Sequence, residues 1–349
     1  MMKKFLFLLM SFLLTVSCSK TDDVNTETSN NNKENDNRYD YEPVDEKKYD
    51  VYIVGYEEIG GVNIAKYWKN GVAHILPEGD IAQSIEVVNN DVYIAGYYKK
   101  GTKNVAKYWK NDLSVNLTDG SIGARAHDII VYNNDIYVTG MVGDYNMNSL
   151  QRKAVYWKNG KKTEITPLVS GKQYVEEIAR DICFDKGEMY ILLENINSRD
   201  NTLYWRDGKR FECKGKGDGI CMDVKDGSVH IAGISIVYGP QRAVTYWKDS
   251  YLTGITDHTV NGYDVTDIEV SGNDVYIAGR DAGDAVYWKN GNSIILKGGS
   301  IAGAIKFIDG KVFAAGGDRK KLNYWENGQL TTYTTTGEVF VTSMAVVKK

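Results

Sequence analysis

Four aspartates, one histidine and one arginine are the side chains of this sequence best suited to binding or catalysis. They occupy matching positions in short, evenly spaced apolar segments: Asp128, Asp181, Asp223 and Asp267, with His127 and Arg180 directly before the first two acids. If these segments line one central channel, carboxylates near its mouth can hold a cation or a polar ligand through their oxygens. The structural alternative is that each carboxylate accepts hydrogen bonds from backbone N–H groups of a neighbouring segment.

Other signatures of chemistry are missing from the sequence. The histidines lie in distant segments without metal-ligand spacing: His74, His127, His230 and His258. No Gly-rich phosphate loop opens a helix, and no Gly-x-Ser-x-Gly elbow is present. We therefore expect no metal, no cofactor and no catalytic residue of a familiar type. A net charge of −4 provides no basic surface, so we expect no nucleic-acid partner. We also expect the protein to be monomeric.

Every tryptophan of the chain belongs to one recurring phrase, which begins as Ala-x-Tyr-Trp-Lys-Asn-Gly at Ala65–Gly71. Successive tryptophans are 41, 48, 48, 42, 41 and 37 residues apart, at Trp68, Trp109, Trp157, Trp205, Trp247, Trp288 and Trp325. Repeats of about 40–45 residues with four strands each are typical of propeller blades. Seven copies therefore predict seven blades.

The stretch Ala82–Leu117 shows the pattern of one blade. Turn residues separate four segments of strand character: Ala82–Val88, Val92–Tyr98, Val105–Lys110 and Leu113–Leu117. Tyr49–Tyr56 matches a second strand, whereas Val341–Val347 matches a first strand. We predict an all-β, seven-bladed propeller over residues 49–349, with four antiparallel strands per blade and the last strand completing the first blade. Such closure removes an exposed sheet edge.

The repeated Tyr-Trp pairs have two interpretations. Adjacent residues of a strand point to opposite faces, so each pair can pack against two neighbouring blades. The alternative is a row of aromatic platforms for sugars. A ligand site would not require the Tyr-Trp pair at the same strand position in all seven repeats, so the pattern favours packing between blades. The Lys-Asn-Gly that follows predicts a tight turn between third and fourth strands.

The repeat resembles the HAF-type extracellular repeats of secreted bacterial proteins. Ala154–Gly160 stands in the place of that family's Ala-Phe-x-Trp and Asn-Gly turn, and Asn89–Gly96 in the place of its Asn-Asn turn and following strand. Tyr156 replaces the apolar residue that the family has before Trp. The resemblance covers roughly residues 49–347 and implies a propeller outside the cytoplasm, with no defined chemistry.

The longest loops are expected on one sector of the ring. Gly143–Arg152 connects strands within the third blade, Pro167–Glu177 leads to the next blade, and a further insertion follows Tyr238. Loops on a rigid scaffold often carry function, and neutral variation in loop length is the alternative. His127 and Arg180 flank this sector. We therefore predict a ligand site formed by His127, Asp128, Arg180, Asp181, Tyr145 and Tyr174.

Three cysteines remain beyond position 18. Cys183, Cys213 and Cys221 allow at most one internal disulfide. Cys213 and Cys221 are nearest in sequence, but one is expected in an outer strand and the other in an innermost strand. That separation disfavours a disulfide, so we expect three buried thiols.

The N-terminus has the pattern of an export signal. A basic start, Met1–Lys4, is followed by the apolar run Phe5–Val16, which is too short to span a membrane. Residues 1–17 are therefore predicted to be a signal peptide. Cys18 after Leu-Thr-Val-Ser resembles a bacterial lipobox, with Thr15 where Leu is usual. That resemblance implies cleavage before Cys18 and its acylation, which attaches the chain to a membrane; plain secretion is the alternative.

Residues 18–48 are predicted to be the lipidated cysteine and a disordered acidic tether. The segment is rich in Asn, Asp, Glu and Thr and nearly lacks apolar residues. Lys20 followed by acids resembles the surface-export signal of Bacteroidota lipoproteins. We expect an outer-membrane lipoprotein of the cell envelope exposed at the surface, with the periplasmic face as the alternative.

Three functions are compatible with this sequence. The first is a non-enzymatic module that binds a glycan or a protein. The second is a scaffold for envelope assembly. The third is a propeller lyase or hydrolase that uses the channel acids with His127 and Arg180; it requires two or more of these side chains to converge in a deep pocket. We favour the binding module.

Overall fold

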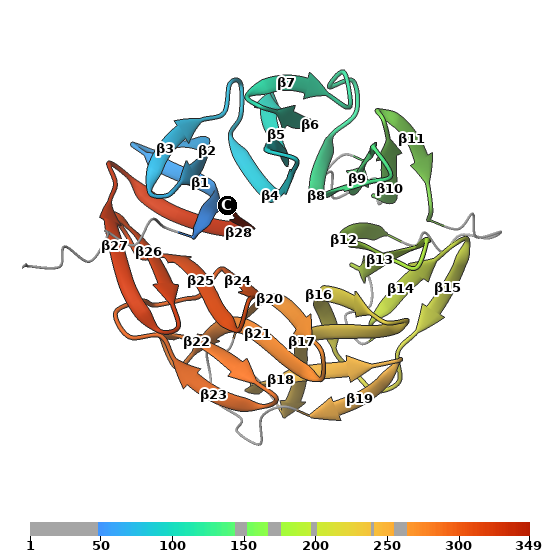
Figure 1. The fold of residues 1–349 in the computed structure, drawn as a ribbon. Helices are drawn as coiled ribbons and strands as arrows, with labels where there is room; N and C mark the ends of the chain where they lie inside the picture. The colour runs from blue at the N-terminus through green and yellow to red at the C-terminus, as the bar shows by residue number, and fades with distance from the viewer. Residues whose placement is uncertain (1–47, 144–151, 167–175, 197–200, 239–240, 255–263) are drawn as a thin grey trace, which may run out of the picture. The chain divides into compact units, whose positions relative to one another are not determined.

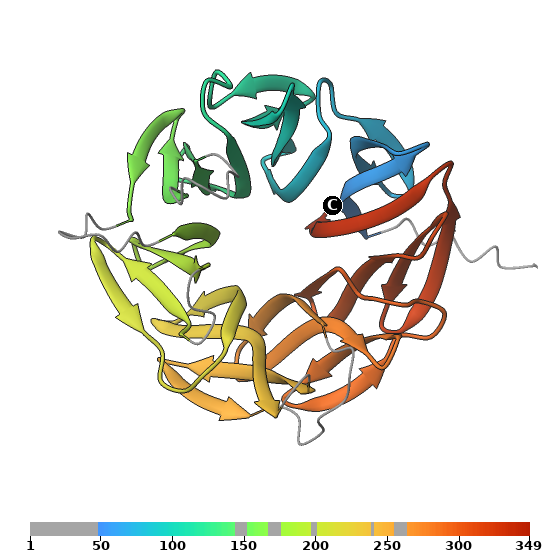
Figure 2. The same cartoon turned by 180° about the vertical axis from the view of Figure 1, so that it is seen from behind.

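The computed structural model describes residues 48–143, 152–166, 176–196, 201–238, 241–254 and 264–349. These residues form seven separate four-stranded antiparallel sheets, or blades, arranged as a ring (Figure 1). The view from behind shows the same ring, with one strand of each blade nearest the axis (Figure 2). The predicted all-β, seven-bladed propeller is confirmed. Within these described ranges no helix is long and apolar enough to cross a membrane.

The strands of each blade follow one another from the axis of the ring outward. In that order, blade 1 contains β28 (Glu338–Lys348), β1 (Tyr49–Ile59), β2 (Val62–Lys69) and β3 (Val72–Ile75). Blade 2 contains β4 (Ile81–Val88), β5 (Asp91–Lys100), β6 (Lys103–Lys110) and β7 (Leu113–Asn116). Blade 3 contains β8 (Ala124–Tyr132), β9 (Asp135–Val142), β10 (Lys153–Lys158) and β11 (Lys161–Glu164).

The other four blades repeat this order. Blade 4 contains β12 (Glu177–Asp185), β13 (Glu188–Asn195), β14 (Leu203–Arg206) and β15 (Lys209–Glu212). Blade 5 contains β16 (Asp218–Lys225), β17 (Ser228–Tyr238), β18 (Gln241–Lys248) and β19 (Tyr251–Gly254). Blade 6 contains β20 (Asp264–Ser271), β21 (Asp274–Asp281), β22 (Asp284–Lys289) and β23 (Asn292–Ile295). Blade 7 contains β24 (Ala304–Ile308), β25 (Lys311–Gly317), β26 (Lys321–Glu326) and β27 (Gln329–Thr334).

The ring closes within blade 1. β28 pairs antiparallel with β1 from Tyr49 opposite Lys348 to Glu58 opposite Glu338. Glu57 adds a second connection, because its buried carboxylate accepts hydrogen bonds from the Lys66 ammonium and from the Gly337 N–H just before β28. Burial acts to raise the pKa of Glu57, but these hydrogen bonds lower it below its ordinary value. The predicted completion of the first blade by the last strand is confirmed.

The Asn-Gly at the end of the recurring phrase forms a turn that is hydrogen-bonded to the second strand. Asn70 and Gly71 both have positive φ, and they form the tight turn between β2 and β3, as predicted. The Asn70 amide also accepts a hydrogen bond from Val51 N–H at 3.0 Å and donates to Asp50 at 2.8 Å. The same pair of bonds recurs at Asn111, Asn159 and Asn290. The turn is therefore fastened to the start of the second strand in several blades.

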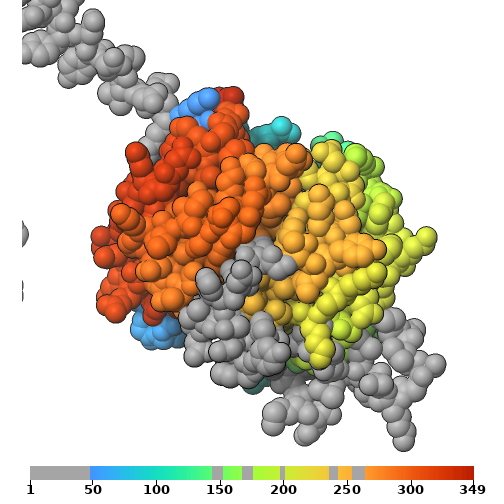
Figure 3. Space-filling model, turned by 90° about the horizontal axis from the view of Figure 1, so that it is seen from below, coloured from blue at the N-terminus to red at the C-terminus, as the bar shows by residue number. Residues whose placement is uncertain are grey.

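The aromatic end of the phrase packs between blades. Six of the seven tryptophans are buried, and Trp205 is partly buried. Trp109 of blade 2 lies in one apolar cluster with Tyr52 and Ala65 of blade 1, and Trp325 of blade 7 lies with Tyr276 of blade 6. Each indole thus covers the preceding blade. Blades 5 to 7, yellow to red, lie next to one another in the view from below (Figure 3). The predicted packing role is confirmed.

Candidate functional site

Six of the seven inner strands carry a β-bulge at one shared level, and this bulge defines the candidate site. In each case one residue lies outside the pairing with the second strand: Gln83, His127, Arg180, Ile220, Thr266 and Thr342. Bulges of this kind re-aim a side chain away from the regular strand alternation. His127 and Arg180 therefore share one structural position in blades 3 and 4, as the repeat pattern predicts.

The predicted column of acids is correct in three blades and wrong in blade 5. Asp128, Asp181 and Asp267 directly follow the bulge, but in blade 5 that place belongs to Cys221. Asp223 lies two residues further along the strand. The register is set by the residue that precedes the bulge, which faces the glycine of the second strand in blade 5 as in blades 2, 3 and 6. Matching one aspartate to another therefore misplaces this strand.

The column acids bond to the backbone of the next blade. Asp128 accepts from Ile182 N–H at 2.9 Å, Asp181 from Met222 N–H at 2.8 Å and Asp267 from Ile305 N–H at 2.9 Å. Each recipient strand is the innermost of its blade, so one of its edges has no partner strand. A carboxylate at that edge satisfies an N–H group that would otherwise stay unpaired. The structural alternative for these acids therefore applies to all three.

A second level of acids lies two residues beyond the first. Asp223 accepts from Val270 N–H at 2.7 Å, and Glu86 accepts from Val131 N–H. In blades 6 and 7 the same level holds Glu269 and Lys306, whose ammonium lies 3.2 Å from the Glu269 carboxylate. Lys306 also lies 3.7 Å from the Asp267 carboxylate, so the inner strands combine backbone capping with ion pairs from Lys306 to two acids of blade 6.

Burial and mutual repulsion act on these acids. Burial, together with the Asp128 charge, holds the pKa of Asp181 well above its ordinary value. Burial also raises the pKa of Asp267. It raises the pKa of Glu86 to about 7. Protons are therefore retained near the axis of the ring at pH values where exposed carboxyls have lost theirs.

Replacement of Glu86 is expected to change stability in a pH-dependent way. The folded-state pKa of about 7 exceeds the ordinary 4.5, so the stability that neutral Glu86 contributes is present below pH 4.5 and is lost as the pH rises to 7. Glu86→Gln keeps an acceptor for the Val131 N–H and cannot ionise. Relative to wild type, it should gain about 1–3 kcal/mol in unfolding free energy at about pH 8, and little at about pH 4.

Urea unfolding of both chains across this pH range measures the difference. The same exchange at the exposed Glu58 controls for the loss of one charge. A Glu86→Gln effect of constant size at every pH would contradict a raised pKa of Glu86 in the folded protein.

His127 is the least satisfied polar group of the bulge row. Its Nε2 is buried and has no hydrogen-bond partner within the described part of the chain, although other atoms of the residue reach solvent. Burial, and then the nearby charges of Arg180 and Arg125, lower the pKa of His127 to about 3. The imidazole is therefore neutral, and it offers one nitrogen to a ligand rather than a positive charge.

Arg180 lies on the adjacent bulge and is engaged within its own blade. Its guanidinium forms an ion pair with Glu194 of β13, while 40% of its side chain remains exposed. Exposed N–H groups of a fixed guanidinium can still receive a carboxylate or hydroxyl. The structure thus brings His127, Asp128, Arg180 and Asp181 together on two adjacent inner strands.

The other two predicted site residues are not among the described ones. Tyr145 and Tyr174 lie outside the described residues, as do most of Gly143–Arg152 and Pro167–Glu177. Among described side chains, no group of three or more His, Cys, Asp or Glu is arranged to hold a metal ion. The acids are arranged around the ring as caps for backbone N–H groups.

The cysteines of the described chain do not form disulfides. Cys213 and Cys221 are buried and Cys183 is partly buried, so the expectation of three thiols holds and full burial applies to two of them. Cys183 and Cys221 lie on neighbouring inner strands, and burial raises the pKa of both thiols. Inert structural thiols of this kind add no nucleophile to the candidate site.

Comparisons with known proteins extend the description of the fold. No protein-family model matches the chain, and no curated protein matches its sequence. Among solved structures, polysaccharide lyase Uly1 is similar at a TM-score of 0.50 and 10% identity, over 85% of this chain and 88% of that one. A puromycin-hydrolyzing peptidase of Mycobacterium tuberculosis is similar at a TM-score of 0.51 and 10% identity, over 80% of this chain and 52% of that one.

A third similar structure is an acylaminoacyl peptidase of Pyrococcus horikoshii, at a TM-score of 0.50 and 11% identity. The likeness covers 83% of this chain and 51% of the peptidase. The chain thus spans about half the length of the two peptidases. These likenesses show the fold alone. What the site does must be argued from its own residues.

Proposed function

We propose that this chain is a binding module of the bacterial cell envelope, which recognises a glycan or a protein at the bulge level of blades 3 and 4. One observation carries the proposal. The Nε2 of His127 is buried with no partner among the described residues, and it lies one residue from a fully engaged acid. A buried polar atom left unpaired costs stability, so such an atom is a candidate contact for a ligand.

The engagement of the acids supports binding over catalysis. Asp128 and Asp181 already accept backbone N–H groups of the next blade, which occupies oxygens that a general base would need. Their proposed role is to hold two inner strands at a fixed separation. His127 and Arg180 then contact the ligand, with Tyr145 and Tyr174 supplying aromatic contacts from the loops.

The experiment is a glycan array combined with an envelope-protein pull-down, using the detergent-purified full chain. His127→Ala is expected to reduce the signal of the captured ligand at least about tenfold, because it removes a hydrogen bond to a buried partner. His74→Ala, a histidine that stacks on Tyr67 in blade 1, is the matched control. Equal capture by wild type and His127→Ala would remove the proposed site.

The location of the module rests on its N-terminus. We infer a lipoprotein attached to the outer membrane through acylated Cys18, with its HAF-like propeller facing the cell surface. Cys18→Ser is expected to move the chain from the membrane fraction to the soluble fraction and to abolish metabolic labelling with a fatty acid. Protease added to intact cells separates the two faces: a surface protein is degraded, and a periplasmic one survives.

A further inference from the structure

The linkers between blades normally complete the hydrogen bonding of the repeated tryptophans. Trp109 Nε1–H donates to the Pro77 carbonyl at 2.9 Å, and Trp247 and Trp325 donate to the Lys214 and Lys297 carbonyls at 3.0 Å. All three acceptors lie in the segment that leads from the preceding blade's fourth strand. A buried indole N–H requires such a partner.

A glycine of the same linkers lies against each indole. A Cβ on Gly79, Gly217 or Gly299 would come within 2.6–2.7 Å of the six-membered ring of Trp109, Trp247 or Trp325. The absence of a side chain therefore lets the linker backbone cover the ring. Carbonyl and glycine together form a lid over these three tryptophans.

The linker from blade 2 to blade 3 departs from this pattern. Leu76 N–H bonds to Ala65, and Leu117 N–H bonds to Ala106 in the same way, so these leucines are equivalent. The chain then takes six positions to reach Ala82 but nine to reach the equivalent Ala126. The nearest atoms to a Cβ on Gly120 belong to Val105 and Lys100, not to an indole.

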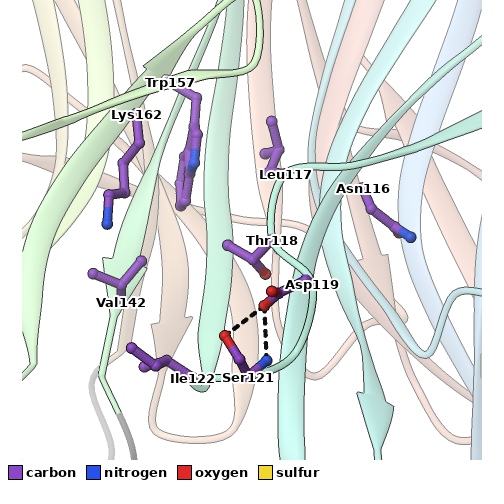
Figure 4. A pocket seen from close by; sticks show the side chains of 9 residues that line it. All are labelled: Asn116, Leu117, Thr118, Asp119, Ser121, Ile122, Val142, Trp157 and Lys162. Carbon is purple, nitrogen blue, oxygen red and sulfur yellow. Dashed lines mark hydrogen bonds between the residues drawn. The ribbon is translucent and has the colours of Figure 1, made fainter.

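Trp157 is left without its usual partner as a result. Its side chain is only 1% exposed, yet its Nε1–H has no acceptor within the residues that the structure describes. The structure instead has a pocket of about 650 Å³ at this place. Its walls come from Trp157, Val142 and Lys162 of blade 3 and from the linker residues Leu117, Thr118 and Ile122 (Figure 4). The volume is within the range of small-molecule sites.

The surroundings of the indole combine apolar and polar groups. In Figure 4 the indole lies between Lys162 and Leu117, with Val142 and Thr118 beyond its lower edge. Asp119 accepts from the N–H and hydroxyl of Ser121 at 2.8 and 2.6 Å, which fixes the outer part of the linker. The pocket thus has one buried donor, an apolar wall and a rim of hydroxyl, carboxylate and ammonium groups.

We propose that this pocket binds the acetamido group of an N-acetylated sugar. The ligand carbonyl takes the place that a linker carbonyl has in blades 2, 5 and 7, and it accepts the Trp157 Nε1–H. The acetyl methyl packs on Leu117, Val142 and Ile122. Sugar hydroxyls bond to the rim, where Asp119, Ser121 and Lys162 offer both donors and acceptors. A peptide carbonyl could also accept the indole N–H, but a peptide offers fewer hydroxyl groups to hydrogen-bond with the polar rim.

The proposal rests on the proposed binding function but uses different residues, so the two can fail separately. The test follows indole N–H resonances of the full chain, purified in detergent and labelled with ¹⁵N-tryptophan. Trp157→Phe assigns the Trp157 signal by its disappearance. Addition of N-acetylglucosamine is expected to shift that signal and to leave the Trp109 and Trp325 signals in place, because their N–H groups already have acceptors.

Three variants and two further probes sharpen the result. Trp157→Phe and Ile122→Asp are expected to weaken binding about tenfold or more, and Trp109→Phe is expected to leave the affinity unchanged. Glucosamine, which lacks the acetyl group, should not shift the Trp157 signal. A Trp157 signal that stays in place, or that moves equally with glucosamine, overturns the proposal. A shift with N-acetyl-alanine methylamide but not with the sugar assigns the pocket to peptides and also overturns it.

An array signal lost in His127→Ala, together with an unmoved Trp157 resonance, would retain the proposed function and reject this pocket. A shifted Trp157 resonance, together with an array signal that His127→Ala retains, would keep the pocket and reject the site at His127 and Arg180.

Discussion

Trp109→Ala is expected to lower the unfolding free energy of the ring by about 3–5 kcal/mol. Trp109 is fully buried, packs on Tyr52 and Ala65 of the preceding blade, and donates its indole N–H to the Pro77 carbonyl. The substitution therefore opens a cavity between two blades and leaves a carbonyl without its donor. Equilibrium unfolding in urea, followed by far-UV circular dichroism, measures the change.

Trp205→Ala is the matched comparison for this prediction. Trp205 occupies the same place in the phrase but is only partly buried, in contact with Tyr156 of blade 3. Its loss should cost less than half as much, because less apolar area returns to water. Equal losses at the two positions would show that burial between blades does not determine the contribution of these tryptophans.

Removal of residues 338–349 is expected to abolish cooperative unfolding altogether. These residues form β28, whose Met344 and Val339 are buried against blade 7 and whose backbone pairs along β1. Without β28, the β1 edge and the apolar face of blade 7 are both exposed. An unpaired edge beside an apolar surface promotes aggregation. Size-exclusion chromatography should show aggregates, and thermal unfolding should show no cooperative transition.

Two controls separate this effect from nonspecific damage. A chain shortened by only Lys348 and Lys349 should retain a wild-type transition, because both side chains are half exposed. A synthetic peptide of residues 338–349, added to the shortened chain, should restore the transition by pairing with β1. A truncated chain that unfolds like wild type without the peptide would refute closure by β28 as a requirement for stability.

The repeating part of the architecture is readable from the sequence because it depends on local chemistry. Asn70 and Gly71 adopt positive φ, so each copy of the phrase predicts a tight turn. Trp109 is too large and apolar to remain exposed, so each copy also predicts one interface between blades. The pairing of β1 with β28 is also readable, since each half of blade 1 lacks what the other supplies. Regular spacing makes these long-range contacts predictable.

The candidate site is less predictable because it depends on exceptions to the repeat. The bulge shifts the alternation of an inner strand by one residue, so the sequence pattern assigns Asp223 to the wrong level. The buried Trp157 Nε1–H, which has no acceptor among the described residues, accompanies a linker that is three residues longer. The length of this linker can be counted in the sequence, but its path cannot be predicted from it. The spacing between Leu117 and Ala126, compared with the other linkers, is the signal that could have revealed it.

The capping of inner strands gives the ring a direction. Carboxylates of blades 2 to 6 each reach forward to the backbone of the following blade, through Glu86, Asp128, Asp181, Asp223 and Asp267. In blades 7 and 1 neither level holds an acid: the residues there are Ala304 and Lys306 in blade 7 and Ser343 and Ala345 in blade 1. The forward series therefore starts beside the one blade that both ends of the chain build together. Circular permutants with new termini on either side of blade 1 would preserve every link of the series, whereas a cut inside blades 3 to 6 would place a chain end within it.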